Sequence, residues 1–424
     1  MECFEELSFP DWAVKQLRDE GYIQPLPIQV QCWPIALGGH DMVGIADTGS
    51  GKTVAYVLPM LVHIIAQKEL QPGEGPVGLV IVPTRDLCQQ VARTVRQFTN
   101  IWGLECQSIF GGTSQAEQEE CLRKRSDIIV ATPGRFIDML NRGKTNLLRA
   151  TFIVLDEADE LLDQDFGDQI RLLLSHVRPD RQVLLFSATW PEKVERFAAD
   201  VCREQPIHVC VGGTKLSACK DIDQQFREAG PGGEKMSVLI AELQKIVPLM
   251  TRDGSKALIF CNSREHVKEV LGKVQDEGWP ADGFTGDRTQ GERDEALRKF
   301  TELHGGTSIL VCTQVLGRGY DFKDVKYVIN YDMPRKLVEY VHRIGRTGRA
   351  GRKGTSITIM EELDLLMARD IRELLRSSNQ DHDACVTIPA FIQHACSGAE
   401  LRRLRSLRDQ RRASHSGAPS IIIK

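Results

Sequence analysis

The chain lacks long apolar runs and a leading basic segment. None of its 424 residues falls in an apolar run that approaches the roughly 18 residues of a membrane-spanning helix. Its first stretch, MECFEELSFPDW, is acidic, whereas a signal peptide begins basic and then turns apolar. We therefore expect an intracellular protein, in the cytoplasm or the nucleus, with no membrane partner.

Paired cysteines and an excess of positive charge are also missing. The 12 cysteines form no C-x-x-C pair and no Cys/His cluster, which argues against a zinc site or a disulfide framework and favours reduced, buried thiols. The formal net charge is −4, unlike that of a protein that is basic all over. Aromatic residues make up 6% and do not alternate with basic ones, so we expect any nucleic-acid contact to be local and directed at the backbone.

The chain is long enough for two or three domains. Short β-branched or apolar runs alternate with longer helix-patterned segments, which is typical of α/β folds with parallel sheets. The predicted strands are 42–45, 78–82, 127–131, 152–156, 183–187, 257–261, 308–312, 327–331 and 356–360.

A distinctive motif follows most of these strands. Ligands of open α/β sheets bind at the carboxyl ends of the strands, so we expect the motifs to line two adjoining rims. In chain order the motifs are ADTGSGKT, PTRDL, TPGR, DEAD, SAT, CNSR and TQVLGRGYD.

The first motif, ADTGSGKT (46–53), has the pattern of a phosphate-binding loop between a strand and a helix. Its glycines let backbone N–H groups close on the phosphates. Lys52 is predicted to reach the β- and γ-phosphate oxygens, and Thr53 to hold Mg²⁺. In DEAD (156–159), Asp156 is predicted to bind Mg²⁺ through its water shell and Glu157 to orient or deprotonate the attacking water.

Residues 342–349, HRIGRTGR, carry an arginine at every third position. One explanation is a solvated helix face. However, glycine costs about 1 kcal/mol in a helix interior relative to alanine, so the two glycines favour arginines held in a set geometry for phosphate. Arginines that reach the triphosphate from a second domain would make hydrolysis depend on closure of the two domains.

Together, these motifs in this order resemble the DEAD-box family of ATP-dependent RNA helicases, over roughly residues 4–375. The resemblance implies an α/β fold of two tandem RecA-like P-loop domains, each a mostly parallel sheet flanked by helices. We expect an N-terminal ATP-binding domain at 1–212, a short flexible linker at 213–221, a C-terminal helicase domain at 222–378 and a partly flexible, arginine-containing tail at 379–424.

The stretch GYIQPLPIQ (21–29) resembles the family's adenine-recognition motif, with Phe4 as the upstream aromatic residue. The Gln29 amide can pair with adenine while Tyr22 stacks on its ring, which favours ATP over GTP. The implied nucleotide-binding residues are Phe4, Tyr22, Gln29, Ala46, Asp47, Thr48, Gly49, Ser50, Gly51, Lys52, Thr53 and Asp321. Mg²⁺ is the implied cofactor, held by Thr53 and Asp156.

The resemblance also implies catalytic, RNA-binding and coupling residues. The catalytic set is Lys52, Asp156, Glu157, Arg346 and Arg349, with the last two as arginine fingers. The RNA-binding set is Pro83, Thr84, Arg85, Gly111, Gly112, Thr132, Pro133, Arg135, Gly286, Asp287, Arg288, Arg293 and Thr313, whose amides, hydroxyls and single arginines suit sequence-independent backbone contacts. Coupling between domains is assigned to Ser187, Ala188, Thr189, His342 and Arg343, with Arg343 bonded to the acidic motif of the first domain.

Four positions depart from the family pattern. Asp86 stands in place of glutamate, and Leu26 replaces a threonine that helps to fix the phosphate loop. Gln314 and Gly317 stand where the family often has aspartate and alanine. The segment around Gln314, to which coupling is also assigned, therefore departs from the family pattern.

We expect an RNA-dependent ATPase that opens short RNA duplexes locally or remodels RNA–protein complexes, acting as a monomer and open to protein regulators. An ATP-controlled RNA clamp with little unwinding has the same sequence features, and a DNA helicase is disfavoured by the adenine motif and TPGR. In the tail, residues 399–412 contain leucines at spacing three among six arginines. These residues predict either a solvated amphipathic helix or an auxiliary RNA contact.

Overall fold

The computed structural model describes residues 4, 9–47, 49–71, 73–211, 221–229, 234–302, 306–317, 322, 324–348 and 352–377. The chain divides into two compact units, Met1–Leu216 and Ser217–Lys424. Predictions for Thr48, Asp321 and Arg349, for the tail and for nearly all of the linker fall outside the described residues.

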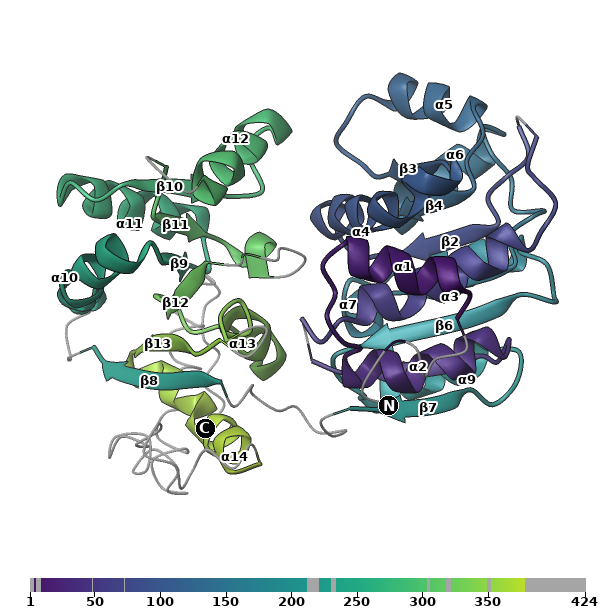
Figure 1. Cartoon of the computed structure of the whole chain (residues 1–424). Helices are drawn as coiled ribbons and strands as arrows, with labels where there is room; N and C mark the ends of the chain where they lie inside the picture. Colours follow the sequence, from purple (N-terminus) through teal and green to yellow (C-terminus); the bar gives the residue numbers. More distant parts are fainter. Residues whose placement is uncertain are drawn as a thin grey trace, which may run out of the picture. The chain divides into compact units, whose positions relative to one another are not determined.

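The described residues of the first unit form a seven-stranded parallel sheet in the order β3-β4-β2-β5-β6-β1-β7 (Figure 1). The strands are β1 (Met42–Ile45), β2 (Gly78–Ile81), β3 (Cys106–Ile109), β4 (Ile128–Ala131), β5 (Phe152–Leu155), β6 (Gln182–Ser187) and β7 (Ile207–Cys210).

Helices cover both faces of this sheet, because successive strand residues point to opposite sides. Val80, Val154 and Leu184 belong to a core with α1 to α4, whereas Leu79, Ile153 and Leu185 belong to a core with α6 to α9. The helices are α1 (Asp11–Asp19), α2 (Pro27–Leu37), α3 (Lys52–Ile65), α4 (Arg85–Thr99), η2 (Asn100–Trp102), α5 (Gln115–Arg123), α6 (Pro133–Asn141), α7 (Ala158–Asp163), α8 (Gly167–Ser175) and α9 (Glu192–Val201).

The described residues of the second unit form a six-stranded parallel sheet in the order β10-β11-β9-β12-β13-β8 (Figure 1). Its strands are β8 (Ile222–Glu228), β9 (Lys256–Phe260), β10 (Ala281–Phe284), β11 (Ile309–Cys312), β12 (Val325–Asn330) and β13 (Gly354–Met360). Its helices are α10 (Lys235–Asp253), α11 (Arg264–Asp276), α12 (Gln290–Thr301), η3 (Gln314–Gly317), α13 (Leu337–Ile344), η4 (Glu362–Met367) and α14 (Ala368–Ser377).

Two parallel α/β sheets are the predicted fold class, and each predicted strand matches an observed strand within two residues at either end. The strands that the sequence did not reveal, β3, β7, β8 and β10, are the outermost strands of the two sheets. Each outermost strand mixes buried with partly or fully exposed residues, whereas a strand such as β4 is buried throughout. Continuous apolar runs in the sequence therefore mark the interior strands of each sheet but not its edge strands.

Two further expectations concern membranes and cysteines. No helix in the described part of the chain is long and apolar enough to cross a membrane. The cysteines in the described ranges are free thiols, and Cys32, Cys88, Cys106, Cys261 and Cys312 are buried.

Candidate functional site

The predicted phosphate-binding loop connects β1 to α3. Gly49 and Gly51 have φ angles of 80° and 90°, in the left-handed region that favours glycine. The amide of Ala46 donates to the carbonyl of Ser187 at 3.2 Å, which ties the start of the loop to the end of β6. A Cβ on Gly51 would lie 2.6 Å from Gln29 Nε2, so space as well as backbone conformation requires glycine there.

Lys52 is the first residue of α3, and its side chain is buried. Its Nζ donates to the carbonyl oxygens of Ala46 at 2.6 Å and Asp47 at 2.9 Å. Burial lowers the pKa of Lys52, and the Asp156 carboxylate opposes that shift. Ser50 Oγ is also buried and has no hydrogen-bond partner within the described ranges. An amino group and a hydroxyl beside a glycine-rich turn are suited to binding phosphate.

Asp156 follows β5 directly and is 4% exposed. Its Oδ2 accepts a hydrogen bond from the Tyr56 hydroxyl at 3.0 Å, and its Oδ1 accepts one from the Glu157 amide at 2.9 Å. Burial raises the pKa of Asp156, while Lys52 and the Tyr56 hydroxyl lower it. Tyr56 was not predicted, but it lies four residues after Lys52 on α3, a spacing that puts both side chains on one helix face.

Glu157 caps the start of α7 with a φ of 52°, a left-handed conformation that costs a residue other than glycine about 1–3 kcal/mol and is concentrated at functional sites. Its side chain is buried beside Asp156. Among the described residues, no three His, Cys, Asp or Glu side chains are grouped closely enough to hold a metal ion. Mg²⁺ usually keeps several waters and binds through one or two carboxylates together with substrate phosphates, and the oxygens of Asp156 and Thr53 are ligands of the kind that it takes.

The SAT motif at the end of β6 is bonded to the end of the DEAD motif. Thr189 Oγ1 donates to Asp159 Oδ2 at 2.8 Å, and both side chains are buried. The Thr189 amide donates to Ser187 Oγ at 3.4 Å across Ala188. Asp159 was not among the predicted site residues, although it is the last residue of the motif that supplied two of them.

Gln29 links the predicted adenine motif to the phosphate loop. Its side chain is 1% exposed; Oε1 accepts from the Leu26 amide at 2.9 Å, and Nε2 donates to the Gly51 carbonyl at 3.2 Å. These two bonds use one donor and one acceptor of an amide that has two donors and two lone pairs. The amide thus fixes the loop and retains further hydrogen-bonding capacity.

Phe4 lies in the hydrophobic core of the first unit. It is 1% exposed, and its ring centroid lies 6.3 Å from that of Trp33. Its contact with the nucleotide stays a prediction. Tyr22 is partly buried, with its ring 6.0 Å from Phe98.

The predicted RNA-binding residues of the first unit lie at strand ends. Thr84 begins α4, where its Oγ1 accepts from the Leu87 amide at 3.3 Å. Arg85 packs against Gly112, because a Cβ on Gly112, whose φ is 83°, would lie 1.8 Å from Arg85 Nη2. Glycine is therefore needed for the guanidinium to occupy this position.

The TPGR motif begins α6 after β4. Thr132 is the N-cap with extended backbone, and Pro133 occupies the first helical turn. Arg135 Nη1 donates to Gln118 Oε1 at 3.3 Å and lies 3.5 Å from the Thr113 carbonyl. Because β3, β4 and β2 are neighbours in the sheet, the set comes together at one rim: Pro83, Thr84, Arg85, Gly111, Gly112, Thr132, Pro133 and Arg135.

The corresponding set in the second unit follows β10 and β11. Arg288 Nη1 donates to Asp282 Oδ1 at 2.9 Å, and the Arg293 guanidinium lies 5.9 Å from the centroid of the Phe284 ring. The Thr313 amide donates to the Phe284 carbonyl at 3.2 Å, which joins the ends of the two strands. These neighbouring strand ends carry Gly286, Asp287, Arg288, Arg293 and Thr313.

Arg343 was predicted to bond to the acidic motif of the first domain, but the structure buries it within the second unit at 1% exposure. Its Nε donates to Gln314 Oε1 at 2.7 Å, Nη1 to the Asp332 carbonyl at 2.8 Å and Nη2 to Asn262 Oδ1 at 2.7 Å. Local acceptors therefore hold the guanidinium within the second unit, and its bond to the first domain stays a prediction. The CNSR motif, which supplies Asn262, was the sequence signal for one of these partners.

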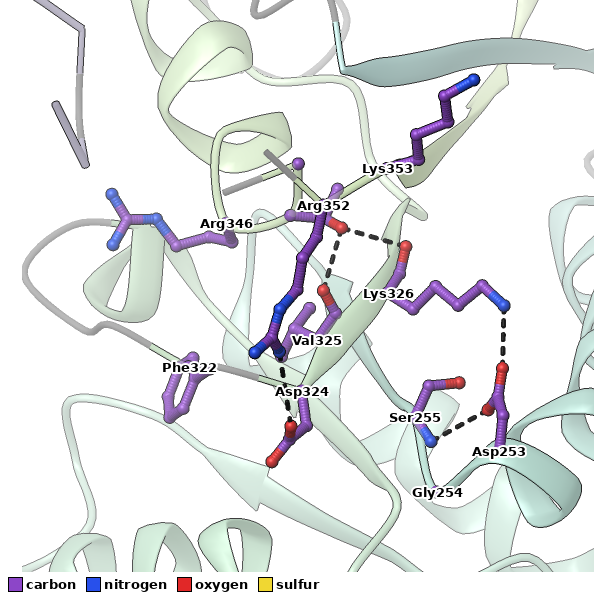
Figure 2. Close-up of a pocket in the computed structure, with 12 residues that line it drawn as sticks. Asp253, Gly254, Ser255, Phe322, Asp324, Val325, Lys326, Arg346, Arg352 and Lys353 are labelled. Atoms are coloured by element: carbon purple, nitrogen blue, oxygen red, sulfur yellow. Dashed lines mark hydrogen bonds and ion pairs between the residues drawn. The ribbon is translucent and has the colours of Figure 1, made fainter. Parts of the chain in front are cut away.

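Arg346 follows α13 and lines a pocket of about 210 Å³ in the second unit (Figure 2). Its Nε donates to the His342 carbonyl at 3.2 Å. Figure 2 shows Arg352 directed at Asp324, 3.9 Å away, and Arg346 extending in a different direction. The guanidinium of Arg346 therefore does not share the carboxylate partner of Arg352.

The sequence matches two family profiles, "DEAD/DEAH box helicase" over residues 26–197 and "Helicase conserved C-terminal domain" over residues 234–351. The ATP-dependent RNA helicase DBP2 of Candida albicans is 42% identical over 390 residues, which are 92% of this chain and 67% of that protein. DEAD-box ATP-dependent RNA helicase 20 of Arabidopsis thaliana is 41% identical over 380 residues, which are 90% of this chain and 74% of that protein.

Solved structures agree with this match. Mss116p bound to single-stranded RNA and AMP-PNP has a TM-score of 0.80 at 27% identity, covering 97% of this chain and 85% of that one. Dbp5 of S. cerevisiae bound to RNA and ADP BeF3 has a TM-score of 0.77 at 25% identity, covering 95% of this chain and all of that one. With both profiles and both relatives aligned across its two units, the chain belongs to the DEAD-box family of ATP-dependent RNA helicases.

Proposed function

We propose that this chain couples RNA-stimulated ATP hydrolysis to local, sequence-independent opening of short RNA duplexes or to remodelling of RNA–protein complexes. The observation that carries the proposal is the buried site formed by Lys52, Asp156 and Glu157 at strand ends of the first unit. The relatives are named ATP-dependent RNA helicases, and both solved neighbours hold RNA with a nucleotide analogue. An RNA-dependent ATPase accounts for all of these features.

ATP is the substrate that the phosphate loop fits. Lys52 would exchange its bonds to the Ala46 and Asp47 carbonyls for phosphate oxygens, because its ammonium group is attracted more strongly by an anionic phosphate than by neutral carbonyls. Ser50 Oγ would gain the partner that it lacks among the described residues. Gln29 would keep the loop in place and use its second donor and lone pair for the adenine edge.

Mg²⁺ would be held by Thr53 and, through water, by Asp156, and when bound it would neutralise charge on the transferring phosphoryl group. Asp156 must be ionised for this task, although burial raises its pKa. Lys52 and Tyr56 both favour the ionised form. Glu157, held beside Asp156 by its left-handed backbone, would orient the attacking water and take its proton.

Arg346 and Arg349 of the second unit would reach the γ-phosphate when the two units close on each other. An arginine finger is worth about 10³–10⁵ in rate, so hydrolysis would be slow until closure. Thr189, bonded to Asp159, would couple the hydrolytic site to strand separation. The cycle would then be closure on ATP and RNA, local opening of the duplex, hydrolysis and release.

RNA would bind along the rims of both sheets through backbone contacts. The first unit offers the hydroxyls of Thr84 and Thr132, the arginines 85 and 135, and the amides of a glycine pair. Such groups recognise phosphate and 2′-OH and carry no information on base identity. Binding should therefore be insensitive to sequence and strongly dependent on salt.

The test is steady-state ATP hydrolysis with and without single-stranded RNA, with single-stranded DNA as the nucleic-acid control. Glu157→Gln should abolish the RNA-stimulated rate while ATP still binds. Glu160→Gln is a matched control, because Glu160 lies one turn further along α7 and accepts from Gln164 Nε2 away from Asp156. Equal stimulation by DNA and RNA, or full activity of Glu157→Gln, would contradict the proposal.

A second assay separates unwinding from clamping. A short RNA duplex with a labelled strand should be opened in the presence of ATP and not in its absence. If ATP is hydrolysed and RNA is retained for long times without strand separation, the chain is an ATP-controlled clamp instead of a helicase.

A further inference from the structure

Gln314 has a defined partner in the structure. It stands directly after Thr313 and β11, at the start of η3, where the DEAD-box pattern often has aspartate. Its Oε1 accepts the Nε–H of Arg343 at 2.7 Å. The departure from the family pattern thus lies in direct contact with the motif that also carries Arg346.

The hydrogen bonds that the structure gives to the Arg343 guanidinium all go to neutral oxygens. Its other bonds go to the backbone carbonyl of Asp332 and the side-chain carbonyl of Asn262, and its guanidinium lies 5.3 Å from the centroid of the Phe260 ring. Asn262 is itself held, with its amide donating to Asp332 Oδ2 at 2.8 Å and its Nδ2 to the Met333 carbonyl at 2.7 Å. Arg343 therefore joins α13 to the ends of β9, β11 and β12.

This anchor lies one turn before Arg346. The Arg346 amide donates to the Arg343 carbonyl at 3.0 Å, and Arg346 Nε donates to the His342 carbonyl at 3.2 Å. The last turn of α13 (Leu337–Ile344) therefore positions both the backbone of Arg346 and its side chain as far as Nε. Arg343 holds this turn to the sheet. Arg343 and Arg346 are therefore separated by a single helical turn.

We propose that Gln314 is a positioning residue for Arg346, acting through Arg343; this inference rests on the proposed role of Arg346 in ATP hydrolysis. Gln314 contributes one acceptor, because its Nε2 is buried and has no partner in the described part of the chain. Glutamate has the same length and offers the same acceptor, so it should replace glutamine here. Alanine removes the acceptor and leaves the buried Nε–H of Arg343 without this partner.

The test compares Gln314→Ala and Gln314→Glu in the full chain, measuring kcat and KM for ATP at saturating RNA together with Tm. For Gln314→Ala we expect kcat to fall about 10- to 100-fold, as for a catalytic group displaced by up to about 1 Å, while KM stays near the wild-type value. Gln314→Glu should restore kcat to within about threefold of wild type, because it restores the bond to Arg343.

Tyr340→Phe is the matched control for a loss of stability alone. Tyr340 is also on α13, and its buried hydroxyl donates to Gln224 Oε1 at 2.8 Å, outside the Arg343 network. The Tyr340→Phe variant should lower Tm as Gln314→Ala does and leave kcat unchanged. The inference is overturned if Gln314→Ala keeps its kcat, if Tyr340→Phe loses as much kcat, or if Gln314→Glu fails to recover it.

Arg346→Ala separates a failure of this inference from a failure of the proposed function. If Arg346→Ala loses RNA-stimulated hydrolysis and Gln314→Ala does not, the finger assignment stands and only the positioning role of Gln314 is refuted. If Arg346→Ala keeps full activity, the finger assignment is wrong and the inference falls with it.

Discussion

The Tyr56 hydroxyl is one of the groups, after Lys52, that favour the ionised form of Asp156, and it can be removed alone. Tyr56→Phe deletes the O–H that donates to Asp156 Oδ2 at 3.0 Å and keeps the ring, which lies 5.4 Å from that of Phe186. Burial raises the pKa of Asp156, and the hydrogen bond from Tyr56 opposes that shift. Without the hydroxyl, the pKa of Asp156 in the folded protein should therefore rise further.

The strength of the bond makes this rise measurable. A hydrogen bond to a charged group contributes about 1.5–3 kcal/mol, and losing it disfavours the ionised form of Asp156. Since the proposed mechanism needs Asp156 ionised, the acidic limb of the profile of kcat/KM against pH should move to higher pH. Activity on the alkaline side of the limb should stay close to that of the wild type.

Stability should respond with a definite sign. A carboxyl group whose folded pKa lies above its unfolded pKa binds more protons in the folded state, so its contribution to stability is present at low pH and is lost as pH rises through the folded pKa. In Tyr56→Phe this loss should extend to higher pH than in the wild type. Thermal unfolding across the same pH range measures it.

The assay is ATP hydrolysis at saturating RNA, with kcat/KM for ATP measured at each pH. Tyr340→Phe is the control, since it also removes a buried tyrosine hydroxyl but lies in the second unit, where that hydroxyl donates to Gln224. Its profile should superimpose on that of the wild type. If the Tyr56→Phe profile superimposes as well, the Tyr56 hydroxyl does not set the ionisation of the catalytic carboxylate.

Three further predictions concern the phosphate-binding loop, the coupling of hydrolysis to strand separation, and the predicted RNA-binding rim of the first unit. Gly51→Ala should weaken ATP binding, measured by calorimetry, because a φ of 90° and a Cβ 2.6 Å from Gln29 Nε2 together cost about 2–5 kcal/mol. Thr189→Val should keep RNA-stimulated hydrolysis but lower strand separation in a duplex assay, because it breaks the 2.8 Å bond to Asp159. Arg135→Ala should weaken RNA binding equally for all sequences and reduce the salt slope by about one, measured by titration at several salt concentrations.

Each of these has a control or a contrary outcome. Gly143→Ala is the control for Gly51→Ala, because it introduces backbone strain at a φ of 63° with no atom within 4 Å of the added Cβ. The affinity for ATP should not change in Gly143→Ala. Equal losses of hydrolysis and unwinding in Thr189→Val would place Thr189 in the chemical step instead of the coupling. A loss of RNA affinity in Arg135→Ala that depends on base sequence would contradict backbone recognition.

The sheet interiors and the phosphate loop could be predicted because their signals are local. Strands such as β4 and β5 are buried on both faces, so each is a continuous apolar run in the sequence. The outermost strands β7 and β8 have one neighbour each and contain polar residues, so no local pattern marks them. Their pairing depends on long-range contacts such as Met42 opposite Ile207.

Individual partners were harder to predict than the residues themselves. The motifs indicated Asp156, Thr189 and Arg343, but not Tyr56, Asp159 or Gln314 as the groups that bond to them. Each of these bonds joins segments that are 29 to 100 residues apart in the chain. A motif indicates which residue carries a functional group, whereas the tertiary fold determines which residues that group contacts.

The internal bonds of three predicted site residues differ in how easily they can be exchanged. Gln29 makes two bonds between neutral groups, each worth about 0.5–1.5 kcal/mol net, whereas the Lys52 ammonium makes two bonds that involve a charge, each worth about 1.5–3 kcal/mol. An adenine edge can replace a neutral bond at little cost, and an anionic phosphate can replace the two neutral acceptors of Lys52. Arg343 makes three bonds from a buried charge, each worth about 1.5–3 kcal/mol, and also packs on Phe260. Extending it toward another domain would break all of these contacts, so Arg343 should stay bonded to the strand ends of the second unit and leave the proposed contact with the nucleotide to Arg346.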